Sequence, residues 1–208
     1  MMRLYEFAPT RSIRARWVLQ ELGEEFEAVT VNLVAGDHRR PQFLKINPAG
    51  RVPALVDGDP VITESVAIVL YLAERDAQRR FLPRDIALRS QVYRWLMFAA
   101  TELEQPLWRI ARHTALYPED IRLPAELPIA RQDFAEMAAV LERHMKDRQF
   151  VVGDQVTVAD FVMAYTLDWA NEARLIGEFP NLTTYLERMY ARPNAPPRIA
   201  QALASIAA

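Results

Sequence analysis

The stretch that decides the fold is RVPALVDGDPVITESVAIVLYL, residues 51–72. Residues 53–56 and 60–63 are two short apolar runs, and Asp57-Gly58 between them is a typical hairpin turn signal. The run that follows, residues 65–75, fits either a strand or a helix by periodicity. Its length and a serine that can act as a cap favour a helix. The stretch therefore predicts a β-hairpin followed by a helix.

Polar groups in this stretch form a pattern that suits one kind of ligand. Pro53 cannot donate to a sheet ladder, and a cis Val52-Pro53 bond would turn the Val52 backbone toward an extended, peptide-like ligand. At the start of the predicted helix, backbone N–H groups and the Ser65 hydroxyl suit a carboxylate, and Glu64 suits an ammonium. Alone, this pair is more often a simple helix cap. Combined with Val52-Pro53, it predicts a site for an amino acid joined to a peptide.

The residues before this stretch complete a small α/β domain. Residues 2–7 are β-prone, a helical pattern runs from Ser12 to Gly23, and residues 27–33 alternate as a β-branched strand. At most a short helix follows Pro41. The order β-α-β-(α)-β-β-α, within about 75 residues, predicts a small mixed sheet with helices on its faces. Arginines along the first helix are predicted to form a solvated face: Arg11, Arg14 and Arg16.

Strand signals nearly vanish in the second half of the chain. We predict one domain at residues 1–78, a charged, proline-bearing linker at 79–87 and an all-helical domain at 88–208. Pro106 must kink or end the first long helix of that domain. Apolar residues recur at helical spacing in four places: from Val92 to Leu103, from Phe134 to Met145, from Phe161 to Trp169 and from Leu182 to Met189.

Composition excludes several classes of function. The chain has 208 residues, with 25 basic and 27 acidic ones, and this net charge of -2 argues against nucleic-acid binding. Because there is no cysteine, disulfides, thiolate nucleophiles and zinc–thiolate sites are excluded, and three scattered histidines make a metal site improbable. No apolar run reaches the roughly 18 residues that span a bilayer, and the N-terminus lacks a signal-peptide core. We expect a soluble cytoplasmic protein.

The motif NPAGRVPALVDGDPVITESVAIVLYL, in a small α/β domain joined to helices that carry VTVADF, resembles the cytosolic glutathione transferases. The resemblance covers nearly the whole chain and points to a bacterial, theta-like or serine-type, cysteine-free member. It implies a thioredoxin-like N-terminal domain with a cis Val52-Pro53 bond, an all-α C-terminal bundle, a homodimer and glutathione as co-substrate. It also implies that the Val52 backbone pairs with the cysteinyl unit of glutathione, while Glu64 and Ser65 hold the γ-glutamyl end.

The remaining end of glutathione is a glycine carboxylate, which needs positive charge. The segment AGDHRRPQF resembles the place where theta-like members carry a histidine and a basic neighbour for this role. His38 and Arg39 match those positions. Arg51 lies where such proteins place a basic residue before the cis-proline motif. The resemblance therefore implies that these three side chains bind the carboxylate.

The group that stabilises the glutathione thiolate belongs between the first strand and the first helix, in EFAPTRSIRARW. The absence of cysteine argues against cysteine-dependent lyase, dehydroascorbate and glutaredoxin-like chemistry, and Tyr5 lies inside the strand. Thr10 and Ser12 remain. The usual serine of serine-type members falls near Pro9-Thr10, and Ser12 falls where the helix is capped, but a loop difference of one or two residues reverses this assignment. A turn residue and a helix cap are the alternative roles.

The second substrate is predicted to be a hydrophobic electrophile, such as a halide, epoxide or enone. Candidate pocket residues are Met97, Trp108, Arg112 and Tyr117, although residues of this kind are more often simple core or bundle contacts. We thus predict a detoxifying glutathione S-transferase without a metal. Two alternatives stay open: a non-catalytic glutathione-binding or ligand-carrying protein of the same fold, and a zeta-like glutathione-dependent isomerase. The isomerase would want two consecutive serines and a cysteine at the first helix, which PTRSIRAR lacks.

Overall fold

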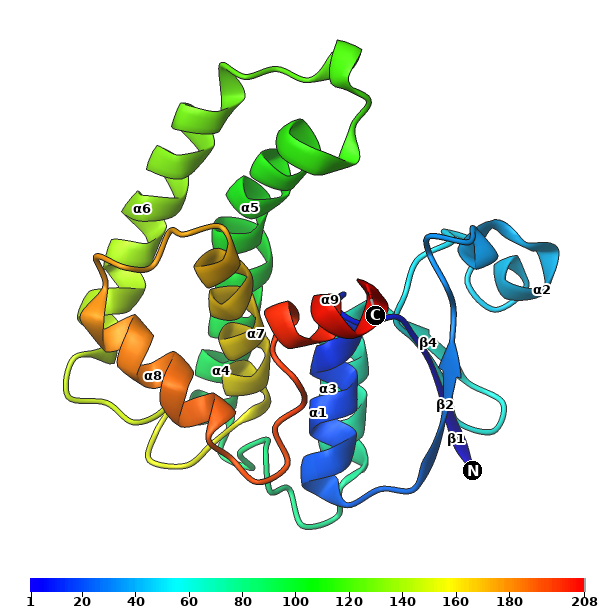
Figure 1. Cartoon of the computed structure of the whole chain (residues 1–208). Helices are drawn as coiled ribbons and strands as arrows, with labels where there is room; N and C mark the ends of the chain where they lie inside the picture. The colour runs from blue at the N-terminus through cyan, green and yellow to red at the C-terminus, as the bar shows by residue number, and fades with distance from the viewer. Residues whose placement is uncertain (208) are drawn as a thin grey trace. The chain divides into compact units, whose positions relative to one another are not determined.

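The computed structural model describes residues 1–207, which divide into two compact units (Figure 1). One unit comprises Met1–Leu82 together with the described residues from Tyr190 onward. Its elements are β1 (Met2–Glu6), α1 (Ser12–Leu22), β2 (Phe26–Thr30), η1 (Asp37–Arg39), α2 (Pro41–Leu44), β3 (Ala54–Val56), β4 (Val61–Thr63), α3 (Ser65–Arg75) and α9 (Ile199–Ala207). No feature of the sequence indicates this return of the chain to the first unit.

The sheet of the first unit has the strand order β2-β1-β3-β4. β1 pairs with β2 in parallel and with β3 antiparallel, and β3 pairs antiparallel with β4 through the predicted hairpin. The predicted order of strands and helices in a small mixed sheet is therefore confirmed. Strand alternation sends Leu4 and Glu6 to the buried α1 face, while the Tyr5 ring lies toward α2, 6.1 Å from the Phe43 ring.

The strand expected at residues 27–33 ends earlier, at Thr30. The Val31 N–H still bonds the Glu6 carbonyl at 2.8 Å, but the next residue leaves the sheet. Asn32 donates its backbone N–H to the Asp37 carboxylate at 3.1 Å and accepts from the Ala35 N–H at 3.0 Å. These local side-chain bonds compete with the ladder and start the loop.

The second unit, Pro83–Met189, is helical in its described structure, as predicted. Pro106 is the third residue of α5, and a π-helical turn directly precedes that helix, so the long helix is interrupted where the proline requires it. Within the described part of the chain, no helix is long and apolar enough to cross a membrane. The elements are α4 (Ile86–Phe98), η2 (Ala99–Leu103), α5 (Glu104–Ala111), η3 (Arg112–Leu116), η4 (Glu119–Ile121), α6 (Glu126–Met145), α7 (Val158–Glu172) and α8 (Pro180–Tyr190).

Two polar groups, the buried Asp160 and the half-buried His144, tie the loop between α6 and α7 to the helices. Asp160 and Thr157 form a capping box at the start of α7, and the Tyr185 hydroxyl donates to the Asp160 carboxylate at 2.9 Å. His144 lies against the Trp95 ring, and its Nε2 is 2.8 Å from the Val151 carbonyl. Burial lowers the pKa of His144, so the neutral imidazole donates this bond.

Candidate functional site

Three strand ends meet at one edge of the sheet in the first unit. Because Tyr5 pairs with Ala54 and Ala54 pairs with Thr63, the end of β1, the start of β3 and the end of β4 lie side by side. Helix α1 begins at this same edge after the loop that follows β1, and helix α3 begins there directly after β4. The arrangement brings two helix N-termini, with their free N–H groups and positive dipole ends, to one place.

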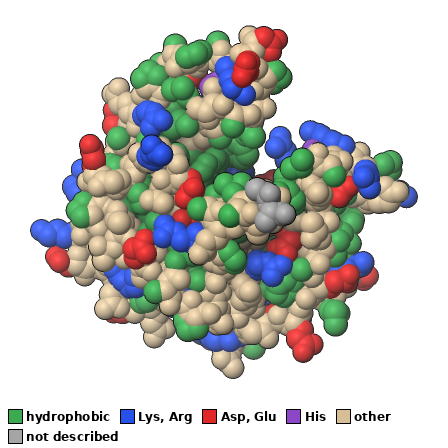
Figure 2. All heavy atoms as spheres, in the orientation of Figure 1, with side chains coloured by type: hydrophobic (Ala, Val, Ile, Leu, Met, Phe, Trp, Pro, Cys, Tyr) green, Lys and Arg blue, Asp and Glu red, His purple; other side chains and the backbone are tan. Residues whose placement is uncertain are grey.

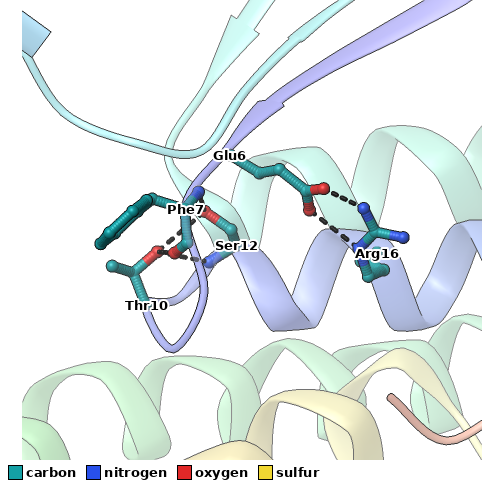
Figure 3. Close-up of polar contacts among 5 residues, drawn as sticks. All are labelled: Glu6, Phe7, Thr10, Ser12 and Arg16. Carbon is teal, nitrogen blue, oxygen red and sulfur yellow. Dashed lines mark hydrogen bonds and ion pairs between the residues drawn. The ribbon is translucent and has the colours of Figure 1, made fainter. Parts of the chain in front are cut away.

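The two candidate hydroxyls lie together in the loop between β1 and α1 (Figure 3). Thr10 Oγ1 is 2.8 Å from Ser12 Oγ, donates to the Phe7 carbonyl, and accepts from the Ser12 backbone N–H at 3.3 Å. Ser12 Oγ in turn accepts from the Phe7 N–H at 3.2 Å. Since the Thr10 proton goes to Phe7, the Ser12 hydroxyl is the donor between the two. The loop therefore holds both hydroxyls in one chain of hydrogen bonds.

The two hydroxyls differ in their access to a ligand. Ser12 is 1% exposed, whereas Thr10 is half-buried. The expected cap at Ser12 is wrong: Arg11 is the N-cap residue of α1 without a side-chain cap bond, and Ser12 is the first helical residue. Its hydroxyl bonds Phe7 and Thr10 instead. Of the two, Thr10 is the hydroxyl that an incoming ligand reaches from outside.

Glu64 and Ser65 stand at the start of α3, as predicted, but in different roles from a simple cap. Glu64 is exposed, is the N-cap residue without a side-chain cap bond, and has φ of 65°, a conformation that non-glycine residues seldom adopt. Ser65 is buried and its hydroxyl accepts from Arg14 Nη1 at 3.1 Å. The cap expected at Ser65 is therefore wrong, because its hydroxyl is used between helices.

Arg14 is a site residue that the sequence did not indicate. The side chain is 1% exposed and joins α1 to α3 through Ser65, which corrects the expectation of a solvated face. Arg16, two residues further along α1, forms an ion pair with Glu6, with Nε and Oε2 2.9 Å apart (Figure 3). No local signal separates these arginines from surface ones, since their partners lie on other elements.

The segment before β3 is held by its own polar groups. The Val52-Pro53 peptide bond is cis, and Pro53 is buried. Asn47, also buried, donates from Nδ2 to the Arg51 carbonyl at 2.7 Å and accepts from the Ala49 N–H at 3.1 Å. The backbone on either side of Arg51 is thus fixed where it meets the edge formed by β1 and β4.

The three candidate carboxylate-binding residues lie on the segment around α2 and on the loop before β3. Figure 2 shows basic side chains gathered over this part of the unit. Arg39 and Arg51 are exposed, and His38 is half-buried with its Nδ1 unpaired among the described residues. The two segments pack closely at Gly50, where a Cβ would lie only 2.9 Å from the His38 carbonyl oxygen. The charges face solvent and are open to an anion.

The four candidates for the electrophile pocket all belong to the second unit. The Arg112 guanidinium lies over the Trp108 ring, 5.7 Å from its centroid, and Trp108 packs edge-on against Trp169. Tyr117 is 5.3 Å from the ring of His113. Met97 is exposed on α4. Trp108 and Arg112 are therefore brought into contact. No group of three or more His, Asp or Glu side chains among the described residues is placed to hold a metal ion.

Comparisons with known proteins define the class. The chain matches the model "Glutathione S-transferase, N-terminal domain" over residues 1–74 and "Glutathione S-transferase, C-terminal domain" over residues 109–193. Glutathione S-transferase F10 of Arabidopsis thaliana is 32% identical over 202 residues, which cover 92% of this chain and 94% of the relative. The chain belongs to the glutathione S-transferase family, and the resemblance noted in the sequence is confirmed.

Two further comparisons bear on the fold and on the class within the family. A zeta-class glutathione S-transferase of Euphorbia esula is 34% identical over 165 residues, covering 78% of this chain and 72% of the relative. The glutathione transferase URE2P6 from Phanerochaete chrysosporium, solved in complex with oxidized glutathione, superposes with a TM-score of 0.84 at 27% identity. That alignment covers 99% of this chain and 96% of the other. The predicted fold, an α/β domain plus a helical one, is confirmed.

Proposed function

We propose that this chain is a glutathione transferase that binds glutathione along the edge formed by β1, β3 and β4. The observation that carries the proposal is the meeting of two helix N-termini with the start of β3, joined by the Arg14–Ser65 hydrogen bond. The N-terminus of α3 suits the γ-glutamyl carboxylate, and that of α1 suits a thiolate. Glutathione carries both groups, on either side of a peptide bond that the Val52 backbone can pair with.

The thiolate is stabilised, in this proposal, by the Thr10 hydroxyl. Thr10 is the accessible member of the pair, and it already accepts hydrogen bonds from the Ser12 hydroxyl and N–H. When the Thr10 proton turns from the Phe7 carbonyl to the sulfur, those two bonds remain and polarise the donor. A free thiol has a pKa near 8.5, and each unit of lowering corresponds to about 1.36 kcal/mol of preference for the thiolate. Ser12 acts here as a positioning residue.

Variants at the two hydroxyls test this assignment. Thr10→Val keeps the shape and removes the donor, so we expect turnover to fall about 100-fold or more, as for loss of one catalytic hydrogen-bond donor, with little change in glutathione affinity. Thr10→Ser restores turnover. Ser12→Ala raises the pKa of the bound thiol less than Thr10→Val does, because it acts through Thr10. Ultraviolet titration of bound glutathione measures these pKa values. A larger effect of Ser12→Ala would transfer the donor role to Ser12.

The two ends of glutathione give separate tests. Glu64 is proposed to accept the γ-glutamyl ammonium, and Ser65 to bind the carboxylate beside it. Ser65→Ala and Glu64→Gln each remove a charged hydrogen bond, so we expect losses of about 1–3 kcal/mol, or roughly 5- to 150-fold in Kd. Isothermal titration calorimetry with glutathione measures them. Unchanged affinity in both variants would place glutathione elsewhere.

Positive charge is proposed to bind the glycine carboxylate through His38, Arg39 and Arg51. Arg39 and Arg51 are exposed and His38 is half-buried, so each arginine contributes a modest part and the effect weakens with salt. We expect Arg51→Gln to weaken glutathione binding severalfold at low ionic strength and less at high ionic strength. A salt-independent change would argue against a direct charge contact. Arg84→Gln, on the second unit, is the matched control.

We further propose that the acceptor is a hydrophobic electrophile and that the protein works in the cytoplasm as a homodimer in detoxification. Trp108 and Arg112, whose stacked side chains present an apolar ring beside a cation, are proposed electrophile contacts together with Met97 and Tyr117. Large exposed apolar side chains recur along one helix, which supports association of copies: Ile86, Leu88 and Tyr93 of α4. Analytical ultracentrifugation tests the dimer, and a panel of aryl halides, epoxides and enones tests the acceptor.

Two alternative functions are distinguished by the same titration. An unshifted thiol pKa with tight glutathione binding would indicate a carrier and not a transferase. The zeta-class relative supports a glutathione-dependent isomerase as the second alternative. Conversion of a substrate to its isomer, with glutathione required but unconsumed, would establish that activity.

A further inference from the structure

Two half-buried tryptophans form an aromatic surface on α5 and α7 of the second unit. The Trp108 ring packs edge-on against the Trp169 ring, with 5.1 Å between the centroids and 86° between the planes. Because both side chains keep part of their surface exposed, an aromatic molecule can cover them. Indole rings offer a large apolar area with few rotamers, so a planar ligand binds to them at little cost in conformational entropy.

Arg112 brings a positive charge to this aromatic surface. It follows Trp108 by four residues, and its guanidinium carbon is 5.7 Å from the centroid of the Trp108 ring. A guanidinium over an indole ring is held there by attraction to the negative face of the ring. The Arg112 side chain is exposed, so its N–H donors are open to a ligand. The charge is therefore held in place beside the two rings.

The carboxylates that α6 offers to α5 are used by another arginine. Arg109, three residues before Arg112, forms ion pairs with both Glu126 and Asp133. Among the residues that the structure describes, no carboxylate forms an ion pair with Arg112. A neutral ligand that covered the indole rings would remove water from this guanidinium without giving it a partner, which is unfavourable. A ligand with an anionic group supplies the partner, so the surface favours an anion.

We propose that the acceptor is an aromatic electrophile that carries a carboxylate, and that Arg112 selects for it. This inference rests on the proposed transferase function and specifies its second substrate. The aromatic body covers the Trp108 and Trp169 rings, and the carboxylate accepts two parallel hydrogen bonds from the guanidinium.

The carboxylate takes no part in the bonds that change. The thiol proton of glutathione passes to water when the thiolate forms. The thiolate sulfur then attacks the ring carbon that bears a halogen, so that a C–S bond forms, the C–halogen bond breaks and the halide leaves with the electron pair. Arg112 only holds the acceptor in position for this attack.

Steady-state kinetics with glutathione and two acceptors of the same shape test the proposal. 4-Chloro-3,5-dinitrobenzoate is the anion, and 4-chloro-3,5-dinitrobenzamide is its neutral counterpart. Each kcat/KM is divided by the uncatalysed rate constant of that acceptor, because the two rings differ in reactivity. We expect the parent protein to favour the benzoate about fivefold, as for one exposed ion pair, and less at high ionic strength.

Variants assign this preference to one side chain. Arg112→Gln removes the charge and should abolish the preference for the benzoate. Arg112→Lys keeps the charge but not the planar fork, and should keep part of the preference. Arg131→Gln removes the same charge from an exposed position on α6 and should leave the preference intact. Thermal melts confirm that each variant is folded.

Equal use of the two acceptors by the parent protein, or a preference that persists in Arg112→Gln, would overturn the proposal. Loss of the preference in Arg131→Gln as well would show that net charge selects the acceptor, and would also reject it. If neither acceptor reacts faster than in water, the proposed transferase function fails. Calorimetry with 3,5-dinitrobenzoate and 3,5-dinitrobenzamide, which lack the leaving group, then decides: tighter benzoate binding that depends on Arg112 retains the anion site, and equal affinities or no binding reject it.

Discussion

Replacing Asp160 with asparagine perturbs a carboxylate of the second unit that accepts four hydrogen bonds. The side chain is fully buried, and its Oδ1 accepts from the Val151 N–H at 2.8 Å and from the Tyr185 hydroxyl at 2.9 Å. Oδ2 accepts from the Thr157 N–H at 2.8 Å and from the Thr157 hydroxyl at 3.0 Å. Burial, together with the adjacent Asp160 carboxylate, raises the pKa of Tyr185 well above its usual range, so that hydroxyl stays a donor.

The size of the loss follows from these contacts. In Asp160→Asn, Oδ1 remains an acceptor, but an NH₂ group replaces Oδ2 and faces the Thr157 N–H, which is also a donor. The Thr157 hydroxyl can turn and accept from the new NH₂ group, but the Thr157 backbone N–H is left buried and unpaired, which costs about 1–3 kcal/mol. In addition, one charged hydrogen bond worth about 1.5–3 kcal/mol is lost. We expect about 2.5–6 kcal/mol in total, a large part of the 5–15 kcal/mol that typically stabilises a domain.

Urea unfolding followed by tryptophan fluorescence measures this loss. Three of the four tryptophans, Trp95, Trp108 and Trp169, belong to the second unit, so the signal reports mainly on it. Asp154→Asn makes the same chemical change at an exposed position, so it is the matched control and should change the free energy of unfolding by less than about 0.5 kcal/mol. A loss below about 1 kcal/mol in Asp160→Asn would refute the reasoning.

Three further predictions concern stability and affinity. Because burial lowers the pKa of His144, the unfolded chain binds this proton more tightly, and the free energy of unfolding should fall as the pH drops below about 6.5. Urea titrations at several pH values should show a flatter dependence of stability on pH for His144→Gln than for the parent protein. Parallel pH profiles of the two proteins would contradict this. Glu142→Gln replaces a carboxylate that accepts from the Asn181 and Leu182 N–H groups at the start of α8, so we expect the free energy of unfolding to fall by about 1–2 kcal/mol in the same assay. No loss would show that water can satisfy these N–H groups instead. Gly50→Ala adds a Cβ to a residue with φ of 60°, only 2.9 Å from the His38 carbonyl oxygen, and so displaces this loop. Calorimetry should then show severalfold weaker glutathione binding. Unchanged affinity would show that the loop does not contribute to the site.

Local signals explain what could be predicted from the sequence. The hairpin and helix of residues 51–72 depend on Asp57-Gly58 and on neighbouring residues, and both form as expected. The end of β2 was missed because Asn32 bonds to Asp37, and such side-chain competition leaves no trace in hydrophobic periodicity. Element type followed from short-range pattern, whereas its boundary depended on a loop contact.

The site was harder to predict because its contacts join distant residues. The sequence predicts that Arg14 lies on a solvated helix face, yet its side chain is buried against Ser65, 51 positions further along the chain. The choice between Thr10 and Ser12 depends on which hydroxyl is accessible, and this is a property of the folded loop. The contact between Trp108 and Trp169 likewise becomes visible only once α5 and α7 meet.

The return of the chain to the first unit has a consequence for synthesis. The Trp17 ring packs 4.8 Å from that of Tyr190, and Glu21 forms an ion pair with Arg192, with 2.6 Å between Oε1 and Nε. On a ribosome, α1 emerges early but waits for both partners until the whole helical unit has been made. α1 is therefore synthesised before the helical unit, but its packing is completed only after that unit has been made.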